Sequence, residues 1–398
     1  MENIQITLPS SKSLSNRWLV LDHLSRNGIK IKNLSTADDT QLLKRLLRQL
    51  KMNRRHNFDC HDAATAARFL IGLCAVTPGI HNITGSERLC QRPMQPLFDA
   101  LRSIGCQIRC TEQEGFLPIT IYGMTPPIGS RVVVDCSLSS QFASAMLLTA
   151  ACATQGFAVE LQNVNASEPY IAMTLQTLTD AEVNWTLKGN PPAYFVEHSI
   201  PNCDVVSIEK DWSAASYFYA VAAFKPEVRL HMSGLLRPST QGDCVVQDIF
   251  SHMGVVSDST GLSIEIERLE EPEKYIEYDF AQTPDIVPSV AVCAAGLGME
   301  ARLKGVSNLI HKESDRLNAL TTELKKMGVR VKTTDEEIHI LPSKLKITQP
   351  VETYGDHRIA MAFATLKALH PNIEITNPDV VSKSFPQFFE MLDRAING

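Results

Sequence analysis

The sequence contains six helix starts of one kind, each at a cluster of Ser, Thr, Asp or Gly. A helix rich in Ala, Ser and other small residues follows each cluster. The clusters are Ser11-Lys12-Ser13, Asp62-Ala63-Ala64-Thr65, Ser137-Leu138-Ser139-Ser140-Gln141, Asp211-Trp212-Ser213, Thr283-Pro284-Asp285 and Gly355-Asp356-His357-Arg358. A helix N-terminus has unpaired backbone N–H groups and the positive end of the helix dipole, and both favour an anion. The six starts are therefore candidate anion sites, although Ser and Asp are also ordinary N-cap residues.

The spacing of these starts predicts a repeated fold. Markers at Ser11, Asp62, Ser139, Asp211, Asp285 and Asp356 are separated by 51, 77, 72, 74 and 71 residues. A second helix is expected in each repeat, over residues 39–50, 94–104, 170–179, 245–253, 315–327 and 386–395. A period this long, with strands and two helices in each unit, favours a repeated α/β module over a solenoid. The short first interval leaves no room for the hairpin of the other units, so we expect a shortened first repeat.

Length, charge and cysteine spacing exclude several classes of protein. A chain of 398 residues exceeds what one hydrophobic core usually serves, which predicts two domains. A net charge of -6 argues against binding nucleic acid or a membrane surface through bulk charge, so any anion site must be local. Ten cysteines without a CxxC pair indicate neither a disulfide scaffold nor a structural metal. No nucleotide-binding glycine motif is present, and the lack of a signal peptide or apolar span predicts a cytoplasmic protein.

Basic residues lie at or near some of these helix starts and also in the segment 311–316. Lys12 begins the first helix and Arg17 follows about one turn later, although a plain capped helix has the same pattern. Lys312 and Arg316 are four residues apart, where like charges on one helical face repel unless an anion lies between them. A solvated charged face is the alternative for this pair. The segment Asp356-His357-Arg358 precedes an apolar helix, where charges need partners, unless Asp356 is only a cap and His357 is structural.

In this order the motifs resemble the enolpyruvyl transferases, most closely the branch that acts on shikimate 3-phosphate. The matching segments include SKSLSNR, DAATAAR, QRPMQPLFDAL, SLSSQFASA, SEPYI, DWSAASYF, PSTQGD, TPD, NLIHKESDR, TYGDHRIAMAFA and SKSFPQFFE. The resemblance implies an α/β fold, an inside-out α/β barrel of two similar domains, each with three repeated βαβαββ units. Residues 11–240 would form the first domain, on the shikimate 3-phosphate side. Residues 1–10 and 241–398 would form the second, on the phosphoenolpyruvate and acid/base side.

The resemblance also implies a reaction in the shikimate pathway, which leads to chorismate and the aromatic amino acids. The enolpyruvyl group of phosphoenolpyruvate would move to the 5-hydroxyl of shikimate 3-phosphate through a tetrahedral intermediate, with release of phosphate. These two small molecules would be the partners of a monomeric enzyme that needs neither a metal nor an organic cofactor. No nucleic acid or membrane partner is implied.

Site residues follow from the resemblance where this sequence matches the family. Ligands of shikimate 3-phosphate would be Lys12, Ser13, Arg17, Ser139, Ser140, Gln141, Ser167, Tyr170, Asp285, Asn308 and Lys312. Ligands of phosphoenolpyruvate would be Lys12, Ala64, Arg92, Gln141, Arg316, Arg358 and Lys383. The catalytic candidates are Asp285 as the base on the hydroxyl, Glu313 as the proton shuttle to C3, and Lys12 as an alternative acid.

The second helix start departs from the family pattern. The family usually has Asn-Ala-Gly-Thr there, whereas this chain has Asp62-Ala63-Ala64-Thr65. The extra methyl group of Ala64 would crowd the phosphoenolpyruvate pocket, and Asp62 adds a negative charge near an anion site. We therefore expect reduced sensitivity to glyphosate, which fills slightly more of that pocket.

Two other functions are compatible with parts of the sequence. The UDP-N-acetylglucosamine enolpyruvyl transferases typically have a reactive cysteine in a Gly-rich loop, and Cys90 lies outside any such loop. A non-catalytic phosphoanion-binding relative is the second alternative. The presence of the charged residues expected for catalysis and binding argues against it: Lys12, Asp285, Glu313, Arg316, Arg358 and Lys383.

Overall fold

The computed structural model describes residues 3–52, 55–164 and 168–398, which belong to two compact units. Unit 1 comprises Met1–Ser11 and Glu209–Gly398, and unit 2 comprises Lys12–Ile208. The boundary after Ile208 lies earlier in the chain than the predicted boundary at residue 240. Residues 209–240 belong to unit 1 because helix α8 (Trp212–Phe224) is buried in its core, and strand β12 (Arg229–Ser233) pairs with β1 (Asn3–Ile6).

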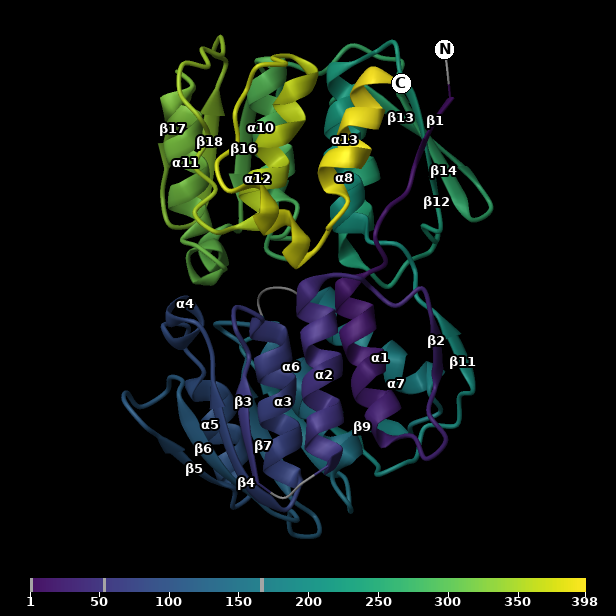
Figure 1. Cartoon of the computed structure of the whole chain (residues 1–398), viewed down its shortest axis with the longest axis vertical. Helices are drawn as coiled ribbons and strands as arrows, with labels where there is room; N and C mark the ends of the chain where they lie inside the picture. The colour runs from purple at the N-terminus through teal and green to yellow at the C-terminus, as the bar shows by residue number, and fades with distance from the viewer. Residues whose placement is uncertain (1–2, 53–54, 165–167) are drawn as a thin grey trace. The chain divides into compact units, whose positions relative to one another are not determined.

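Unit 2 contains the first three repeats (Figure 1). Its central helices, which are the most buried, are α1 (Lys12–Leu24), α3 (Ala64–Val76) and α6 (Ser140–Cys152). The other helices are α2 (Asp38–Met52), α4 (Glu87–Cys90), α5 (Gln95–Ser103) and α7 (Glu168–Asp180). The strands are β2 (Lys30–Lys32), β3 (Arg55–Asp59), β4 (Gly79–Thr84), β5 (Gln107–Cys110), β6 (Ile119–Gly123), β7 (Arg131–Asp135), β8 (Phe157–Gln162), β9 (Trp185–Lys188), β10 (Ala193–Val196) and β11 (Val205–Ser207).

Unit 1 contains the last three repeats, and its central helices are α8, α10 (Val287–Leu297) and α12 (His357–Ala364). The remaining strands are β13 (Val255–Thr260), β14 (Ser263–Arg268), β15 (Tyr275–Asp279), β16 (Glu300–Lys304), β17 (Arg330–Thr333) and β18 (Glu337–Leu341). The other helices are α9 (Val246–Ser251), α11 (Arg316–Lys326) and α13 (Phe388–Asn397). The described part of unit 1 also contains four short 3-10 helices: η1 (Gly242–Val245), η2 (Ser307–His311), η3 (Thr365–Ala368) and η4 (Pro378–Lys383).

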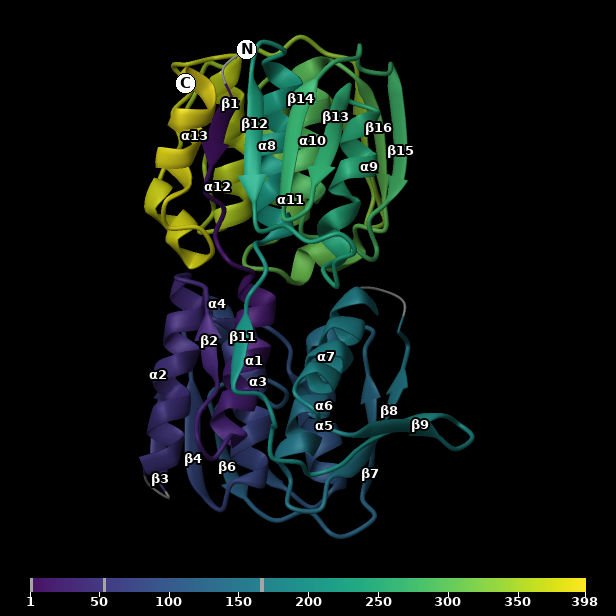
Figure 2. The same cartoon turned by 90° about the vertical axis from the view of Figure 1, so that its right-hand side faces the viewer.

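Among the residues that the structure describes, four sheets of four strands share one topology. Their strand orders are β3-β4-β6-β5, β7-β8-β10-β9, β1-β12-β14-β13 and β15-β16-β18-β17. In each, the first two strands are parallel and the last two form an antiparallel hairpin, as a βαβαββ unit requires. Figure 2 shows the third of these sheets in unit 1.

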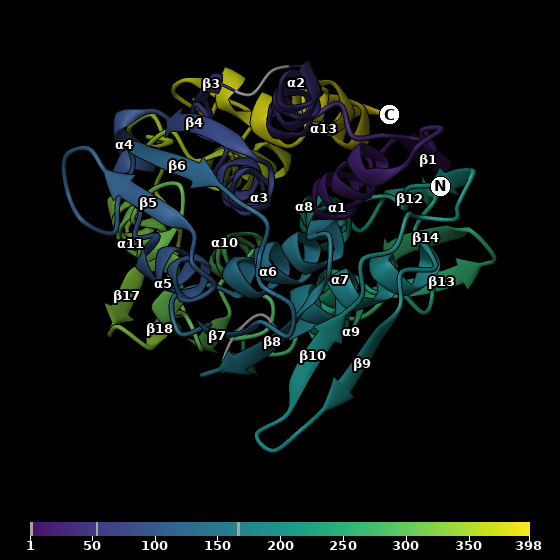
Figure 3. The ribbon, with the colours of Figure 1, turned by 90° about the horizontal axis from the view of Figure 1, so that it is seen from below.

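Each unit has helices in its interior and strands outside them. Helices α8 and α12 are buried along their whole length, and their Ala-rich sequences allow close packing. The strands instead alternate buried and half-buried side chains, as in β16 and β18, so each such sheet has one partly solvated face. Figure 3 shows the strands of unit 2 around its central helices. The predicted α/β fold is confirmed, and burial of the helices gives each unit an inside-out arrangement.

The first repeat is shortened, as the spacing of the helix starts predicted. Strand β2 forms a two-stranded sheet with β11 rather than a four-stranded one. The sixth repeat is also reduced, which the sequence analysis did not predict. Within the described residues, its strand pairing consists of an isolated bridge between Val351 and Ile375. Four of the six repeats therefore contain the full hairpin.

The histidine at the end of α1 predicts a loss of stability in acid. Burial, with Lys51 adding to it, lowers the pKa of His23 to about 4. A histidine in the unfolded chain titrates near 6.5, so the folded state binds fewer protons and stability falls as the pH drops below that value. Between pH 7 and pH 5 we expect His23 to cost about 2 kcal/mol of unfolding free energy.

Urea titrations of the wild type and of His23→Gln at both pH values test this. The wild type should lose about 2 kcal/mol more than the variant. His61→Asn is the matched control, because His61 is exposed and in a left-handed conformation that Asn tolerates. Equal pH dependence of His23→Gln and the wild type would contradict the prediction.

A candidate active site of clustered cations and carboxylates

Some of the predicted helix starts have an N-cap residue whose side chain bonds to the helix, and others do not. Ser139, Asp211 and Asp356 are N-cap residues whose side chains accept backbone N–H bonds from the first turn of α6, α8 and α12. The N-cap residues of α3 and α10 are Ala63 and Ile286, which make no side-chain capping bond. The ordinary capping explanation therefore holds for three starts, and it does not account for the start of α10.

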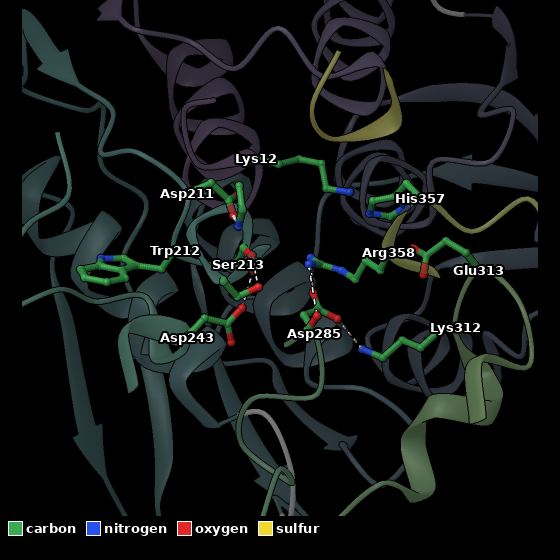
Figure 4. A network of polar contacts seen from close by, with 12 residues as sticks. Lys12, Asp211, Trp212, Ser213, Asp243, Asp285, Lys312, Glu313, His357 and Arg358 are labelled. Atoms are coloured by element: carbon green, nitrogen blue, oxygen red, sulfur yellow. Dashed lines mark hydrogen bonds and ion pairs between the residues drawn. The ribbon is translucent and has the colours of Figure 1, made fainter. Parts of the chain in front are cut away.

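Asp285, which precedes the N-cap residue of α10, is the centre of a charged cluster in unit 1. Its Oδ2 accepts from Arg358 Nη2 at 2.6 Å, and its Oδ1 lies 3.4 Å from Lys312 Nζ (Figure 4) and 3.3 Å from Arg316 Nη1. Burial alone would raise the pKa of Asp285, but Arg358, Lys312 and Arg316 together hold it well below its usual range. Asp285 is therefore ionised and shared among three cations.

Arg316 connects this cluster to the start of α12. Its guanidinium is fully buried; Nε donates to Asp356 Oδ2 at 2.8 Å and Nη2 to Glu313 Oε2 at 2.7 Å. Burial alone would lower the pKa of Arg316, but Asp356, Glu313 and Asp285 raise it above the ordinary value. The cluster balances three cations against three carboxylates, so an anion that binds here must compete with Asp285, Glu313 or Asp356 for their partners.

The expected helical face shared by Lys312 and Arg316 is absent. Lys312 directly follows η2, whereas α11 begins at Arg316 after its own N-cap, Asp315, which accepts from the N–H of Asn318 at 3.0 Å. The prediction was wrong because it treated the segment as one helix, although Asp315 is a good cap. The two cations meet on Asp285 instead.

Asn308 and Lys383, the other predicted residues of unit 1, are in 3-10 helices. Asn308 lies in η2, and its buried Oδ1 has no hydrogen-bond partner among the residues the structure describes. A buried amide oxygen of this kind is suited to accept from a ligand hydroxyl. Lys383 is the last residue of η4 and is buried.

Arg17 forms hydrogen bonds to residues near the starts of three helices of unit 2. Its Nε donates to Thr174 Oγ1 at 2.7 Å, and its Nη2 donates to Ser144 Oγ and to the Tyr170 carbonyl, both at 2.9 Å. Its Nη1 donates to the Ser13 carbonyl at 2.9 Å. Burial lowers the pKa of Arg17 to about 10, partly opposed by Tyr170. This guanidinium therefore joins α1 to α6 and α7 through neutral oxygen atoms.

Two residues that the sequence analysis did not select contact predicted ones. Arg68, buried on α3, donates to Gln141 Oε1 at 2.5 Å, and its guanidinium lies over the Phe142 ring. Asp39, at the start of α2, forms a 3.0 Å ion pair with Lys12. Arg68 is the last residue of the DAATAAR motif, one turn from Ala64, and this spacing was an available signal.

The other predicted residues of unit 2 lie near helix starts. Ala64 is the first residue of α3, Ser140 the first of α6, and both are buried. Arg92 is buried just after α4. Ser167 lies outside the described residues. Asp62 is exposed and accepts a hydrogen bond from the Ser86 hydroxyl.

The described part of the chain has neither a cluster of metal ligands nor a helix suited to a membrane. Within residues 3–52, 55–164 and 168–398, no three His, Cys, Asp or Glu side chains are placed to hold a metal ion. All ten cysteines are unpaired thiols. None of the helices in this part of the chain combines the length and the apolar character needed to span a membrane.

Removal of one buried carboxylate should destabilise unit 1. Asp356→Asn keeps a side-chain oxygen to cap α12 but leaves the Arg316 guanidinium with less compensating charge, so we expect a loss of about 3 kcal/mol in unfolding free energy. Asp315→Asn is the control, because Asp315 is an exposed cap residue and Asn caps equally well. Urea unfolding of both variants measures the difference, and equal stabilities would contradict the prediction.

Comparisons with known proteins point to one family. The family model described as EPSP synthase (3-phosphoshikimate 1-carboxyvinyltransferase) matches residues 52–392. A Bacteroides fragilis protein named 3-phosphoshikimate 1-carboxyvinyltransferase is 37% identical over 395 residues, which covers 98% of this chain and 94% of the relative. A Haemophilus ducreyi protein of that name is 32% identical over 421 residues, covering 98% and 95%.

A solved structure has the same fold. The EPSP synthase structure from Acinetobacter baumannii at 2.37 Å superposes with a TM-score of 0.75 and 21% sequence identity. The match covers 99% of this chain and 96% of that one.

Proposed function

The chain belongs to the EPSP synthase (3-phosphoshikimate 1-carboxyvinyltransferase) family, and we propose that it transfers the enolpyruvyl group of phosphoenolpyruvate to the 5-hydroxyl of shikimate 3-phosphate. The observation that carries this proposal is the Asp285 cluster, in which one carboxylate holds three cations in a partly exposed position. Such a cluster suits a reaction of two anions that also needs a base. We further propose that the enzyme acts as a cytoplasmic monomer.

The proposed ligands of the two anions come from the helix starts described above. Shikimate 3-phosphate would bind Lys12, Ser13, Arg17, Ser139, Ser140, Gln141, Tyr170, Asp285, Asn308 and Lys312, together with Ser167. Phosphoenolpyruvate would bind Lys12, Ala64, Arg92, Gln141, Arg316, Arg358 and Lys383. Helix N-termini and guanidinium groups are the usual partners of phosphate and carboxylate, which supports both sets.

Anion binding would convert Asp285 into a usable base. With its three cations in place Asp285 holds a proton poorly, because its pKa is far below the ordinary value. The carboxylate and phosphate of phosphoenolpyruvate would compete for Arg358 and Arg316, and the pKa of Asp285 would rise as it lost them. The base would therefore become active only when the second substrate is bound.

The proposed chemistry has two steps. In the first, the 5-hydroxyl oxygen forms a bond to C2 of phosphoenolpyruvate, Asp285 takes the hydroxyl proton, and C3 receives a proton from Glu313 or Lys12. In the second, the tetrahedral intermediate expels the phosphate that came from phosphoenolpyruvate, and C3 returns a proton to Glu313 or Lys12 as the C2–C3 double bond forms again. Arg316 and Arg358 would stabilise the negative charge of the intermediate.

Phosphate release from the purified protein tests this function. Release should require both phosphoenolpyruvate and shikimate 3-phosphate. Release with UDP-N-acetylglucosamine in place of shikimate 3-phosphate would instead show a UDP-N-acetylglucosamine enolpyruvyl transferase. Binding of both shikimate-pathway anions without release would favour the non-catalytic relative.

Asp285→Asn should abolish most of the turnover. An amide cannot accept the hydroxyl proton, so we expect kcat to fall by at least about 100-fold. Asp279→Asn is the matched control, because Asp279 is an exposed carboxylate at the end of β15. The measurement is steady-state phosphate release, and a kcat within about threefold of the wild type would remove Asp285 from the role of base.

Ala64→Gly should increase inhibition by glyphosate. The methyl group of Ala64 is buried at the first position of α3, and its removal would leave room for the larger inhibitor. One methyl group in a tight pocket changes binding by about tenfold or more, so the inhibition constant should fall by that factor. Ala63→Gly controls for the added backbone freedom. An unchanged inhibition constant in Ala64→Gly would show that this residue does not limit the pocket.

A further inference from the structure

One face of α11 binds the loop that leads into α12. The Glu323 side chain is 1% exposed; its Oε1 accepts from the Tyr354 hydroxyl at 2.7 Å and its Oε2 from the Glu352 N–H at 3.2 Å. Lys326, ion-paired with Glu323 at 2.8 Å, donates to the Pro350 carbonyl at 3.1 Å. The buried Glu323 carboxylate and Lys326 thus bind the loop at Pro350, Glu352 and Tyr354.

The loop has an unusual backbone conformation at Tyr354. Tyr354 has φ of +55° and the following Gly355 has φ of +68°. Glycine adopts such angles readily, whereas a tyrosine there is an outlier that the surrounding structure must hold. Burial of the ring does not explain it, because Tyr354 is 44% exposed. The hydroxyl bond to Glu323 is the contact that secures this residue.

The same helix also contacts the far end of the turn. Arg316 donates to Asp356, the cap of α12, from a position seven residues before Glu323. Seven residues are two helical turns, so both side chains lie on one face of α11. The first turn of α12 follows at once and contains Arg358, which donates to Asp285 at 2.6 Å. The direction of Arg358 therefore depends on a turn that α11 holds at both ends.

We propose that Glu323 and Tyr354 are positioning residues, which set the location of the Arg358 guanidinium for the anionic substrate through the Tyr354–Gly355 turn. The inference rests on the proposed function in that the anion is taken to be phosphoenolpyruvate. Tyr354 acts through the backbone of the turn and does not touch the substrate. Its pKa supports the donor role, because burial and the Glu323 carboxylate raise it to about 12 and keep the hydroxyl protonated.

Two substitutions of Tyr354 separate positioning from direct contact. Tyr354→Phe removes the bond to Glu323 and leaves a residue that resists the left-handed conformation, so KM for phosphoenolpyruvate should rise about tenfold, with kcat within about threefold. Tyr354→Asn also lacks the phenol, but Asn tolerates this conformation, so its KM should lie within about threefold of the wild type. If Tyr354→Asn is as impaired as Tyr354→Phe, positioning through the turn is wrong.

The matched control is Tyr275→Phe. Tyr275 is another exposed tyrosine of unit 1 whose hydroxyl donates to a glutamate, Glu277, on β15. This variant loses the same kind of bond at a site that plays no part in the proposed reaction. Both kinetic constants should stay at their wild-type values.

A double-mutant cycle tests whether the effect acts through Arg358. In an Arg358→Lys background, Tyr354→Phe should add less than about twofold to KM for phosphoenolpyruvate, because the positioned group has already been altered. Full additivity of the two effects would overturn the proposal.

Amide hydrogen exchange of residues 350–358, measured without substrate, tests the positioning role independently of the proposed function. The Tyr354→Phe variant should exchange faster there, and Tyr354→Asn should match the wild type. If the wild type releases no phosphate from the two substrates, the proposed function fails while this measurement still decides the role of the turn. Wild-type exchange in Tyr354→Phe would overturn the positioning role.

Discussion

The ion pairs of the buried Arg316 guanidinium hold together the charged cluster of unit 1, and the arrangement of its helix starts depends on them. A buried cation is costly unless carboxylates compensate it, and the ones that do so come from separate segments. Asp285 lies before α10, Glu313 before α11, and Asp356 caps α12. One side chain therefore fixes three helix starts relative to one another. One of these carboxylates, Asp285, also contacts the other two cations of the cluster, Lys312 and Arg358.

Unit 2 uses the same principle with a different charge balance. Arg17 joins α1, α6 and α7, but the acceptors that contact it are hydroxyl and carbonyl oxygens. Its positive charge is therefore not offset by those partners, and an anion would relieve the cost of its burial. In the Asp285 cluster of unit 1 the three cations are ion-paired with carboxylates, so an anion would have to compete with those carboxylates for them.

Much of the fold could be predicted because the helix starts recur at nearly regular intervals along the sequence. The six second helices were located to within a few residues, and the shortened first repeat followed from a count of residues. The reduced sixth repeat was missed, because residues 342–356 and 369–377 have a length that is compatible with strands. The structure shows that these two segments pair through one isolated bridge, between Val351 and Ile375. Strand pairing is a long-range property that local sequence does not contain.

The sequence by itself determined the repeat, the family and the residue types available for chemistry, because these depend on spacing and on the identity of side chains. Tertiary structure alone decided which of those residues meet. It placed Lys312 and Arg316 on Asp285 rather than on one helical face, paired Lys12 with Asp39, and moved the unit boundary to Ile208. It also showed that Tyr354 is in a left-handed conformation and bonds to Glu323 on α11, a helix distant from it in sequence. Contacts of this kind join residues tens of positions apart, and their energies depend on burial, which spacing along the chain does not specify.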